Sequence, residues 1–200
     1  MFYYERKFKK EGYDLIIGVD EAGRGPLAGP VVAAAVALKT CRFKNRIDDS
    51  KKLTAQAREK AFFEIINNSI FGIGIVNEKI IDRINILEAS RIAMEQAVVS
   101  LADKLKPAKQ RRIYVNIDGK IKLNLDFPYT GIIKGDSKSK SIASASILAK
   151  VTRDRIMSLY HRLYPQYGFL QHKGYPTKMH RKRIKKFGPS KIHRMTFYGV

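Results

Sequence analysis

The chain has 200 residues, of which 44% are hydrophobic, and this length and composition suit one globular domain with a small appendage. Its longest apolar run, residues 31–38, is far shorter than the ~20 residues of a membrane span, and its first residues lack the apolar stretch of a secretory signal. A single cysteine excludes an internal disulfide and a cysteine-based zinc cage. We therefore expect a cytoplasmic protein without membrane contact and, since nothing indicates an obligate dimer, a monomer.

The chain is strongly basic, with 39 Lys and Arg against 18 Asp and Glu and a formal net charge of +21. The excess is greatest in residues 151–200, which contain twelve Lys and Arg, all four histidines and one acid, Asp154. A positive field of this strength raises the local concentration of polyanions. The charge favours a nucleic-acid partner but identifies neither the kind of nucleic acid nor a reaction.

Apolar segments and turn signals in the first half of the chain predict three strands and a helix. The expected strands are residues 15–19, 31–38 and 71–76. A loop rich in glycine and proline, residues 23–30, separates the first two strands. Thr54 is the expected N-cap of a helix that continues to about Asn67.

The second half predicts two strands, residues 113–117 and 131–134, between longer helices. One helix covers residues 87–105, with Met94 in the core, and ends shortly before Pro107. The longest helix covers residues 141–163. Its expected apolar face consists of Ile142, Ala145, Leu148, Ile156, Leu159 and Leu163. Hairpin-like strands followed by alternating helices and strands predict an α/β fold with a mixed sheet flanked by helices.

Acidic residues follow three of the predicted strands: Asp20 and Glu21, then Asp118, then Asp136. Each Asp alone is an ordinary turn residue, but the ends of neighbouring strands converge at one edge of a sheet. Converging carboxylates repel one another unless a cation neutralises them, and oxygen ligands select Mg²⁺ or Mn²⁺ over zinc. Two such ions about 4 Å apart would activate water and stabilise the leaving oxygen of a phosphodiester.

Other motifs fit the sequence poorly. The glycines of residues 23–29 have the wrong spacing for a dinucleotide-binding loop, and residues 135–140 lack the Gly-Lys-Ser/Thr of a nucleotide-binding P-loop. His172 and His180 have no nearby cysteine and no His-Glu-x-x-His pattern. We interpret these two histidines as solvated or in contact with phosphate.

The segment from Asp20 to Val31, DEAGRGPLAGPV, closely resembles the signature of bacterial ribonuclease HII, the type 2 ribonuclease H. Further blocks match in family order: DSKKL at 49–53, IDG at 117–119, KGD at 134–136, SILAKVTRD at 146–154, HKGY at 172–175, GPS at 188–190 and HR at 193–194. The resemblance covers roughly residues 15–198. It implies a ribonuclease H-like catalytic domain, residues 1–164. After Pro165 the chain becomes basic and aromatic, and we expect a small basic helical C-terminal subdomain there, residues 165–200.

The resemblance implies an endoribonuclease that hydrolyses the RNA strand of RNA–DNA hybrids. It also implies incision of duplex DNA on the 5′ side of single embedded ribonucleotides, as in ribonucleotide excision repair. The implied mechanism uses two metal ions and leaves 3′-hydroxyl and 5′-phosphate ends.

The resemblance further implies roles for single residues. The catalytic residues, which would hold the two Mn²⁺ or Mg²⁺ ions, are Asp20, Glu21, Asp118 and Asp136. The residues implied to read the ribose 2′-hydroxyl are Gly23, Arg24 and Gly25. Tyr175 would pack on the sugar at the RNA–DNA junction, although Pro176 follows it where the family usually has glycine. Independently of the family, Lys51 and Lys150 lie where they would contact backbone phosphates.

Two alternatives remain open from the sequence. The first is a nucleic-acid-binding module without catalysis, in which the acids are structural. The second is a related sheet-based nuclease: a junction resolvase would have no use for a 2′-hydroxyl reader, and a type 1 ribonuclease H would ignore a single ribonucleotide.

Overall fold

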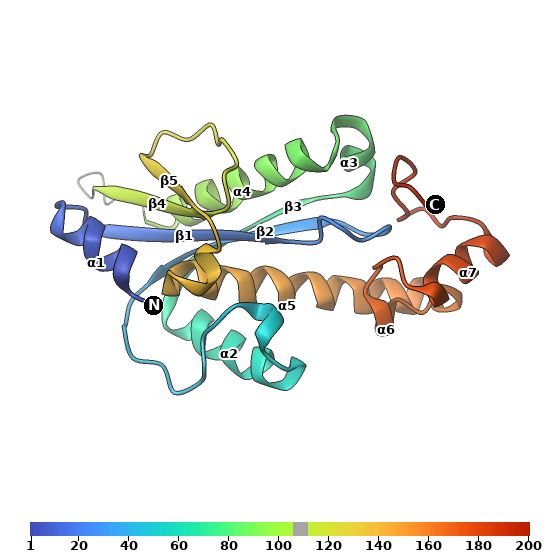
Figure 1. Ribbon diagram of the computed structural model, residues 1–200, viewed down its shortest axis with the longest axis horizontal. Coiled ribbons are helices and arrows are strands. Elements are labelled where there is room, and N and C mark those ends of the chain that lie inside the picture. Colours follow the sequence, from blue (N-terminus) through green and yellow to red (C-terminus); the bar gives the residue numbers. More distant parts are fainter. Residues whose placement is uncertain (106–111) are drawn as a thin grey trace.

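The computed structural model describes residues 1–105 and 112–200 and contains a five-stranded sheet in the order β3-β2-β1-β4-β5 (Figure 1). The strands are β1 (Leu15–Ala22), β2 (Val31–Leu38), β3 (Ser69–Val76), β4 (Ile113–Asp118) and β5 (Tyr129–Ile132). Strands β1, β2 and β3 pair in antiparallel fashion, whereas β4 runs parallel to β1 and β5 runs parallel to β4. The predicted mixed sheet is confirmed.

Helices cover both faces of this sheet. The helices of the described residues are α1 (Tyr3–Lys10), α2 (Ala55–Asn67), α3 (Glu78–Ile84), α4 (Ile86–Asp103), α5 (Lys140–Leu163), α6 (Phe169–His172) and α7 (Lys178–Phe187). Helix α4 lies on one face, and α5 lies on the other with α2 beyond it (Figure 1). None of the helices in the described ranges combines the length and the apolar composition needed to cross a bilayer.

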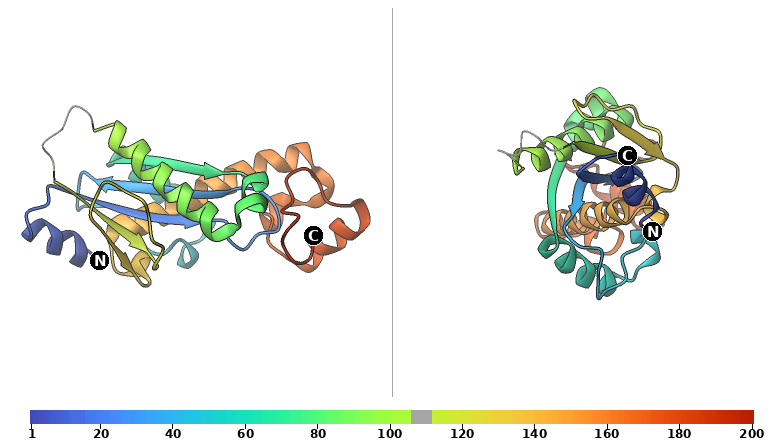
Figure 2. Two further views of the ribbon diagram at one scale, coloured as in Figure 1. Left: turned by 90° about the horizontal axis from the view of Figure 1, so that it is seen from above. Right: turned by 90° about the vertical axis from the view of Figure 1, so that its left-hand side faces the viewer.

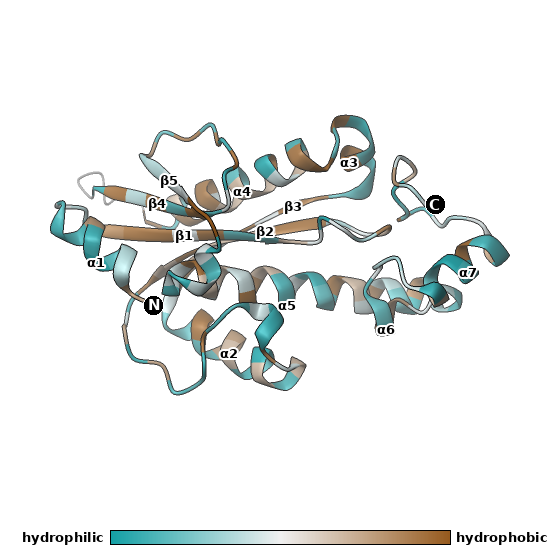
Figure 3. Ribbon diagram, viewed as in Figure 1, coloured by the Kyte–Doolittle hydropathy of each residue, from teal (hydrophilic) through white to brown (hydrophobic). Residues whose placement is uncertain are grey.

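Two apolar cores result from the alternation of side chains along the strands. Ile17 and Val19 of β1 pack toward α4, whereas Ala34 and Val36 of β2 pack toward α5. Long stretches of β1 and β2 are accordingly brown, the hydrophobic colour, in Figure 3. Gly18 brings α5 against β1, because a Cβ at this position would lie 2.2 Å from the Ser141 carbonyl carbon. The N-terminal part of α5 therefore lies directly on the strand that carries Asp20.

The apolar face predicted for α5 is correct only in its first half. Ile142, Ala145 and Leu148 are buried, but Leu159 and Leu163 are 57% and 69% exposed. The second half of α5 extends beyond the sheet and buries a different set of residues, namely Val151, Arg153 and Met157. These three side chains lack the regular apolar spacing that was used to predict the buried face.

Several predicted boundaries also shift. Strand β1 continues through Ala22, so Asp20 and Glu21 lie within it and do not follow it. Strand β5 lies two residues earlier than predicted, at Tyr129–Ile132. The sequence did not predict α1 or α3. Met94 is fully buried as predicted. Pro107, the predicted stop of the preceding helix, lies outside the described residues.

The C-terminal segment has its own apolar cluster at the far end of α5 (Figure 2). This cluster consists of Leu27, Ala28, Met157, Tyr167, Phe169, Ile184 and Ile192. Leu27 and Ala28 belong to the loop 23–30, so the cluster joins this loop to the segment that contains α6 and α7. The division at residue 164 stays a prediction.

Candidate active site

Three of the four predicted acids meet at one edge of the sheet. Asp20 lies in β1, Asp118 is the last residue of β4, and Asp136 lies in the single turn η2 (Gly135–Ser137) that precedes α5. One carboxylate oxygen from each lies within 4.8 Å of the others. Asp20 and Asp136 are only 6% and 7% exposed. Parallel pairing of β1 with β4 brings the first two together, and the turn before α5 adds the third.

The electrostatics of this carboxylate cluster favour a bound cation. Burial raises the pKa of Asp20 well above its ordinary value, and the charges of Glu21 and Asp118 raise it further. Burial, followed by the charge of Asp118, raises the pKa of Asp136. Burial also raises the pKa of Glu21, against the opposing effect of Arg24. Hard oxygen ligands that repel one another fit a divalent cation such as Mg²⁺ or Mn²⁺.

Backbone geometry fixes the two aspartates that follow the parallel strands. The Gly135 N–H donates to Asp118 Oδ1 at 2.6 Å, which ties the end of β4 to η2. A side chain at position 135 would crowd this contact, since its Cβ would lie 3.2 Å from Asp118 Oδ1 and 2.6 Å from Ile142 Cδ1. Glycine at this position therefore lets Asp118 and Asp136 approach each other.

A serine pair supports Asp20 from beneath, and the sequence analysis assigned it no role. Ser146 of α5 forms a side-chain hydrogen bond with Asp20, and its Oγ lies 2.9 Å from the Ser50 Oγ. Both serines are about 95% buried. A chain of hydrogen bonds of this kind orients a metal-ligating carboxylate. The two serines lie in the matched blocks DSKKL and SILAKVTRD. The sequence does not show that Ser50 and Ser146, which are 96 positions apart, form a hydrogen bond.

Glu21 and Arg24 form an ion pair at the start of the loop 23–30. Arg24 Nη1 lies 3.4 Å from Glu21 Oε1, and the Arg24 side chain is half exposed. Gly23 is buried and has a φ of +104°, whereas Gly25 is exposed. A Cβ at Gly25 would meet nothing closer than Tyr175 Cε1, at 3.9 Å. The predicted ribose-reading residues and the predicted junction tyrosine are thus neighbours.

The two predicted phosphate contacts lie in different places. Lys51 lines an open groove of about 590 Å³ together with Asp118 and Asp136. Its burial lowers the pKa of Lys51, but the nearby carboxylates of Asp49, Asp20, Asp136 and Asp118 outweigh this and raise it. Lys150 lies beside Tyr175, with its Nζ 5.7 Å from the ring centroid and 2.8 Å from Asp154 Oδ1. Of these two lysines, Lys51 is therefore the one beside the carboxylate cluster.

The interpretation of His172 and His180 as solvated or phosphate-contacting is wrong. His172, His180 and His193 are buried and stack in the C-terminal cluster, with His180 Nε2 3.0 Å from His193 Nε2. Burial lowers the pKa of both His180 and His193 to about 4, so these rings are neutral at physiological pH. Their neutral rings fill the apolar interior of the C-terminal segment.

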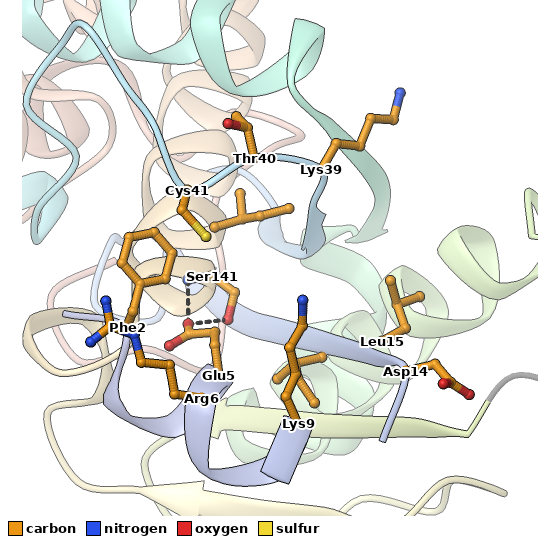
Figure 4. Close-up of a pocket in the computed structure, with 12 residues that line it drawn as sticks. Phe2, Glu5, Arg6, Lys9, Asp14, Leu15, Lys39, Thr40, Cys41 and Ser141 are labelled. Carbon is orange, nitrogen blue, oxygen red and sulfur yellow. Dashed lines mark hydrogen bonds between the residues drawn. The ribbon is translucent and has the colours of Figure 1, made fainter. Parts of the chain in front are cut away.

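A more enclosed pocket, of about 160 Å³, lies between α1, the start of β1 and the N-terminus of α5 (Figure 4). Its buried acid is already engaged: Glu5 Oε1 accepts hydrogen bonds from Ser139 Oγ, Ser141 Oγ and the Ser141 backbone N–H. Among the described residues, the only group of three or more acids, histidines or cysteines close enough to share an ion is Asp20, Asp118 and Asp136. The carboxylate cluster at the sheet edge is therefore the candidate active site.

The sheet is mixed, three carboxylates converge at its edge, and the open groove beside them also carries lysines. These features define a metal-dependent nuclease of the ribonuclease H-like class. The family model described as Ribonuclease HII matches residues 17–200. The chain belongs to the ribonuclease HII family. This confirms the predicted family and the predicted enzyme class, a metal-dependent endoribonuclease of the ribonuclease H type.

The relatives agree in sequence and fold. The ribonuclease HII of Desulfotalea psychrophila is 50% identical over 200 residues, which cover all of this chain and 87% of the relative. The crystal structure of ribonuclease H2 from Pyrococcus horikoshii OT3 is 31% identical, with a TM-score of 0.66, over 92% of this chain and 94% of that one. The structure of Bst-RNase HIII in complex with Mn²⁺ shares the fold at 18% identity, with a TM-score of 0.70 over 92% of this chain and 67% of that one.

Proposed function

We propose that this ribonuclease cleaves the RNA strand of RNA–DNA hybrids and also incises duplex DNA on the 5′ side of single embedded ribonucleotides. The observation that carries the proposal is the position of the Gly23–Gly25 loop. On one side Glu21, which pairs with Arg24, donates its backbone N–H to Asp20 Oδ1 of the carboxylate cluster, and on the other side Gly25 adjoins Tyr175. A ribose 2′-hydroxyl is the group that distinguishes RNA from DNA at a single position. A reader placed beside the reacting site can therefore select one ribonucleotide.

The carboxylates of Asp20, Asp118 and Asp136 would hold two divalent cations, Mn²⁺ or Mg²⁺, with Glu21 beside them. When bound, these cations supply the charge that activates a water molecule and stabilises the leaving oxygen, giving 3′-hydroxyl and 5′-phosphate ends. The Mn²⁺ of the Bst-RNase HIII structure is in line with this choice of ion. Ser50 and Ser146 hold the Asp20 carboxylate in place, and Lys51 attracts phosphate to the groove.

The loop and the tyrosine would then read the sugar. Exposed Gly25 leaves room for a ribose edge to approach the backbone, and the half-exposed Arg24 offers planar donors to a phosphate. Tyr175 is 39% exposed and presents a flat face to the same side. We further propose that the protein works as a monomer in the cytoplasm and serves ribonucleotide excision repair.

One assay tests the proposal: incubation of a DNA duplex that carries one ribonucleotide, with Mn²⁺ or Mg²⁺, against an all-DNA duplex of the same sequence. We expect incision only 5′ of the ribonucleotide, and we expect Asp118→Asn to lower kcat at least ~100-fold because the cation would lose a ligand. Binding of the duplex without metal should change little in this variant.

The outcomes also separate the alternatives. A wild-type protein that cuts the uninterrupted hybrid but ignores the single ribonucleotide would have the specificity of a type 1 enzyme. A protein that binds both duplexes without cutting either would be a binding module. Full activity in Asp118→Asn would refute the site assignment and leave the activity itself intact.

A further inference from the structure

Two arginines are completely buried on the far side of the loop 23–30. Arg153 of α5 and Arg194 near the C-terminus are both 0% exposed. Within the described part of the chain, neither guanidinium lies within ion-pair distance of a carboxylate. Burial lowers the pKa of Arg153 to about 10 and, together with the charge of Arg153, that of Arg194 to about 9. A buried charge is costly unless it is hydrogen-bonded, so the contacts of these guanidiniums matter.

All the hydrogen bonds of the Arg194 guanidinium go to backbone carbonyls of the loop. Its Nε and Nη2 donate to the Gly29 carbonyl at 2.9 and 2.8 Å, its Nη2 also donates to Gly23 at 2.6 Å, and its Nη1 donates to Arg24 at 2.9 Å. The Arg194 backbone N–H donates to the Leu27 carbonyl at 2.8 Å. One planar group therefore fixes both ends of the turn that presents Gly23 to Gly25.

Arg153 joins the same loop to the segment that carries Tyr175. Its Nε donates to the Pro30 carbonyl at 2.9 Å and its Nη2 to the Ala28 carbonyl at 3.0 Å, while its Nη1 donates to the Lys173 carbonyl at 3.0 Å. Its guanidinium carbon lies 5.9 Å from the centroid of the Tyr175 ring. The two halves of the predicted sugar site, which lie about 150 residues apart in the sequence, are thus held by one side chain.

We propose that Arg153 and Arg194 are positioning residues that set the distance between the Gly23–Gly25 loop and Tyr175, and thereby the preference for a ribonucleotide at an RNA–DNA junction. This inference rests on the function proposed above. Neither side chain reaches the solvent, so neither contacts the substrate. Arginine suits these contacts because its donors lie on three separate nitrogens of a planar fork, whereas lysine concentrates all its donors on one nitrogen and cannot span carbonyls that lie this far apart.

The test compares kcat/KM on a DNA duplex with one ribonucleotide and on an uninterrupted RNA–DNA hybrid, in wild type, Arg153→Lys, Arg194→Lys and Arg194→Gln. Partial unfolding lowers both kcat/KM values by the same factor. The ratio of the two values therefore does not depend on the fraction of folded protein. The neutral Gln variant avoids an unpaired buried charge. Arg91→Lys, which alters an ion pair on the distant surface of α4, is the matched control.

We expect the ratio to fall ~10-fold or more in the Arg153 and Arg194 variants, because a loop misplaced by about 1 Å loses much of its differential contact with the sugar. Mn²⁺ affinity, measured by calorimetry, should stay within about twofold of wild type, since the carboxylates lie on other elements. Arg91→Lys should leave the ratio unchanged.

An unchanged ratio in these variants, even with lower activity on both substrates, would overturn the inference and leave the proposed function standing. A wild-type protein that fails to incise at the single ribonucleotide would instead overturn the proposed function, and this inference with it. An equal loss of Mn²⁺ affinity and of activity on both substrates would show that the arginines support the fold alone.

Discussion

Gly23 and Gly25 flank the same arginine, but different physical constraints require them. Gly23 has a positive φ, and a Cβ there would lie 2.2 Å from Arg153 Nε and 2.7 Å from the Pro30 carbonyl oxygen. Gly25 has no such conflict, so the fold itself tolerates a methyl group at this position. The sequence pattern Gly-Arg-Gly does not distinguish these two cases.

This difference predicts opposite outcomes for two matched substitutions. Gly23→Ala should lower the free energy of unfolding by more than ~1 kcal/mol, because both the backbone and Arg153 oppose the new Cβ. Gly25→Ala should leave the unfolding transition unchanged and lower kcat/KM on a single ribonucleotide at least ~10-fold, since the methyl group would occupy space proposed for the sugar. Chemical denaturation and the incision assay measure the two effects. Equal destabilisation in both variants would contradict this account.

Helix α5 connects most parts of the site. It carries Ser146 beneath Asp20, Lys150 beside Tyr175 and Arg153 beneath the loop 23–30. Its N-terminus is fixed by Glu5 of α1, whose Oε1 accepts hydrogen bonds from Ser139 Oγ, Ser141 Oγ and the Ser141 N–H. An acid at a helix N-terminus satisfies donors that the helix itself leaves free.

Removal of this contact should destabilise the protein through α5. We expect Glu5→Ala to lower the free energy of unfolding by ~1–3 kcal/mol, because three buried donors lose their shared acceptor. Glu11→Ala, at an exposed position just after α1, the helix that carries Glu5, should have no measurable effect. Urea denaturation of both variants makes the comparison, and similar midpoints for the two would refute a capping role for Glu5.

At the scale of the whole molecule, a chain of net charge +21 places three of its 18 acids, Asp20, Asp118 and Asp136, where they repel one another. The pKa of Asp20 is raised above its ordinary value of 3.8, so the folded state binds this proton more tightly than the unfolded state does. Protonated Asp20 therefore does not weaken the fold at low pH. In metal-free protein, the free energy of unfolding falls as the pH rises above about 4, because Asp20 must then lose its proton in the folded state. A divalent cation restores it by binding only the folded state.

These relations predict the behaviour of Asp20→Asn in thermal unfolding. Without metal, the variant should exceed wild type in Tm, and the difference should grow as the pH is raised from about 4 and level off above the raised pKa of Asp20. Added Mn²⁺ should raise the Tm of wild type more than that of the variant. Asp126→Asn, at an exposed position, should follow wild type throughout. A variant that is less stable than wild type at every pH would contradict the inference that ionised Asp20 destabilises the metal-free fold.

The sequence by itself determined the strands, the main helices and the family, because local periodicity and short motifs encode these. Thr54 and residues 31–38 were placed correctly for this reason. The sequence also named Asp20, Asp118 and Asp136, the three acids that the structure brings together. Only the tertiary structure decided which side chains are buried. His172 and His180 become core residues, Leu159 becomes exposed, and Arg194 reaches Gly29 across 165 residues. Burial and hydrogen bonding depend on contacts between segments that are distant in the sequence, and a local sequence pattern does not predict such contacts.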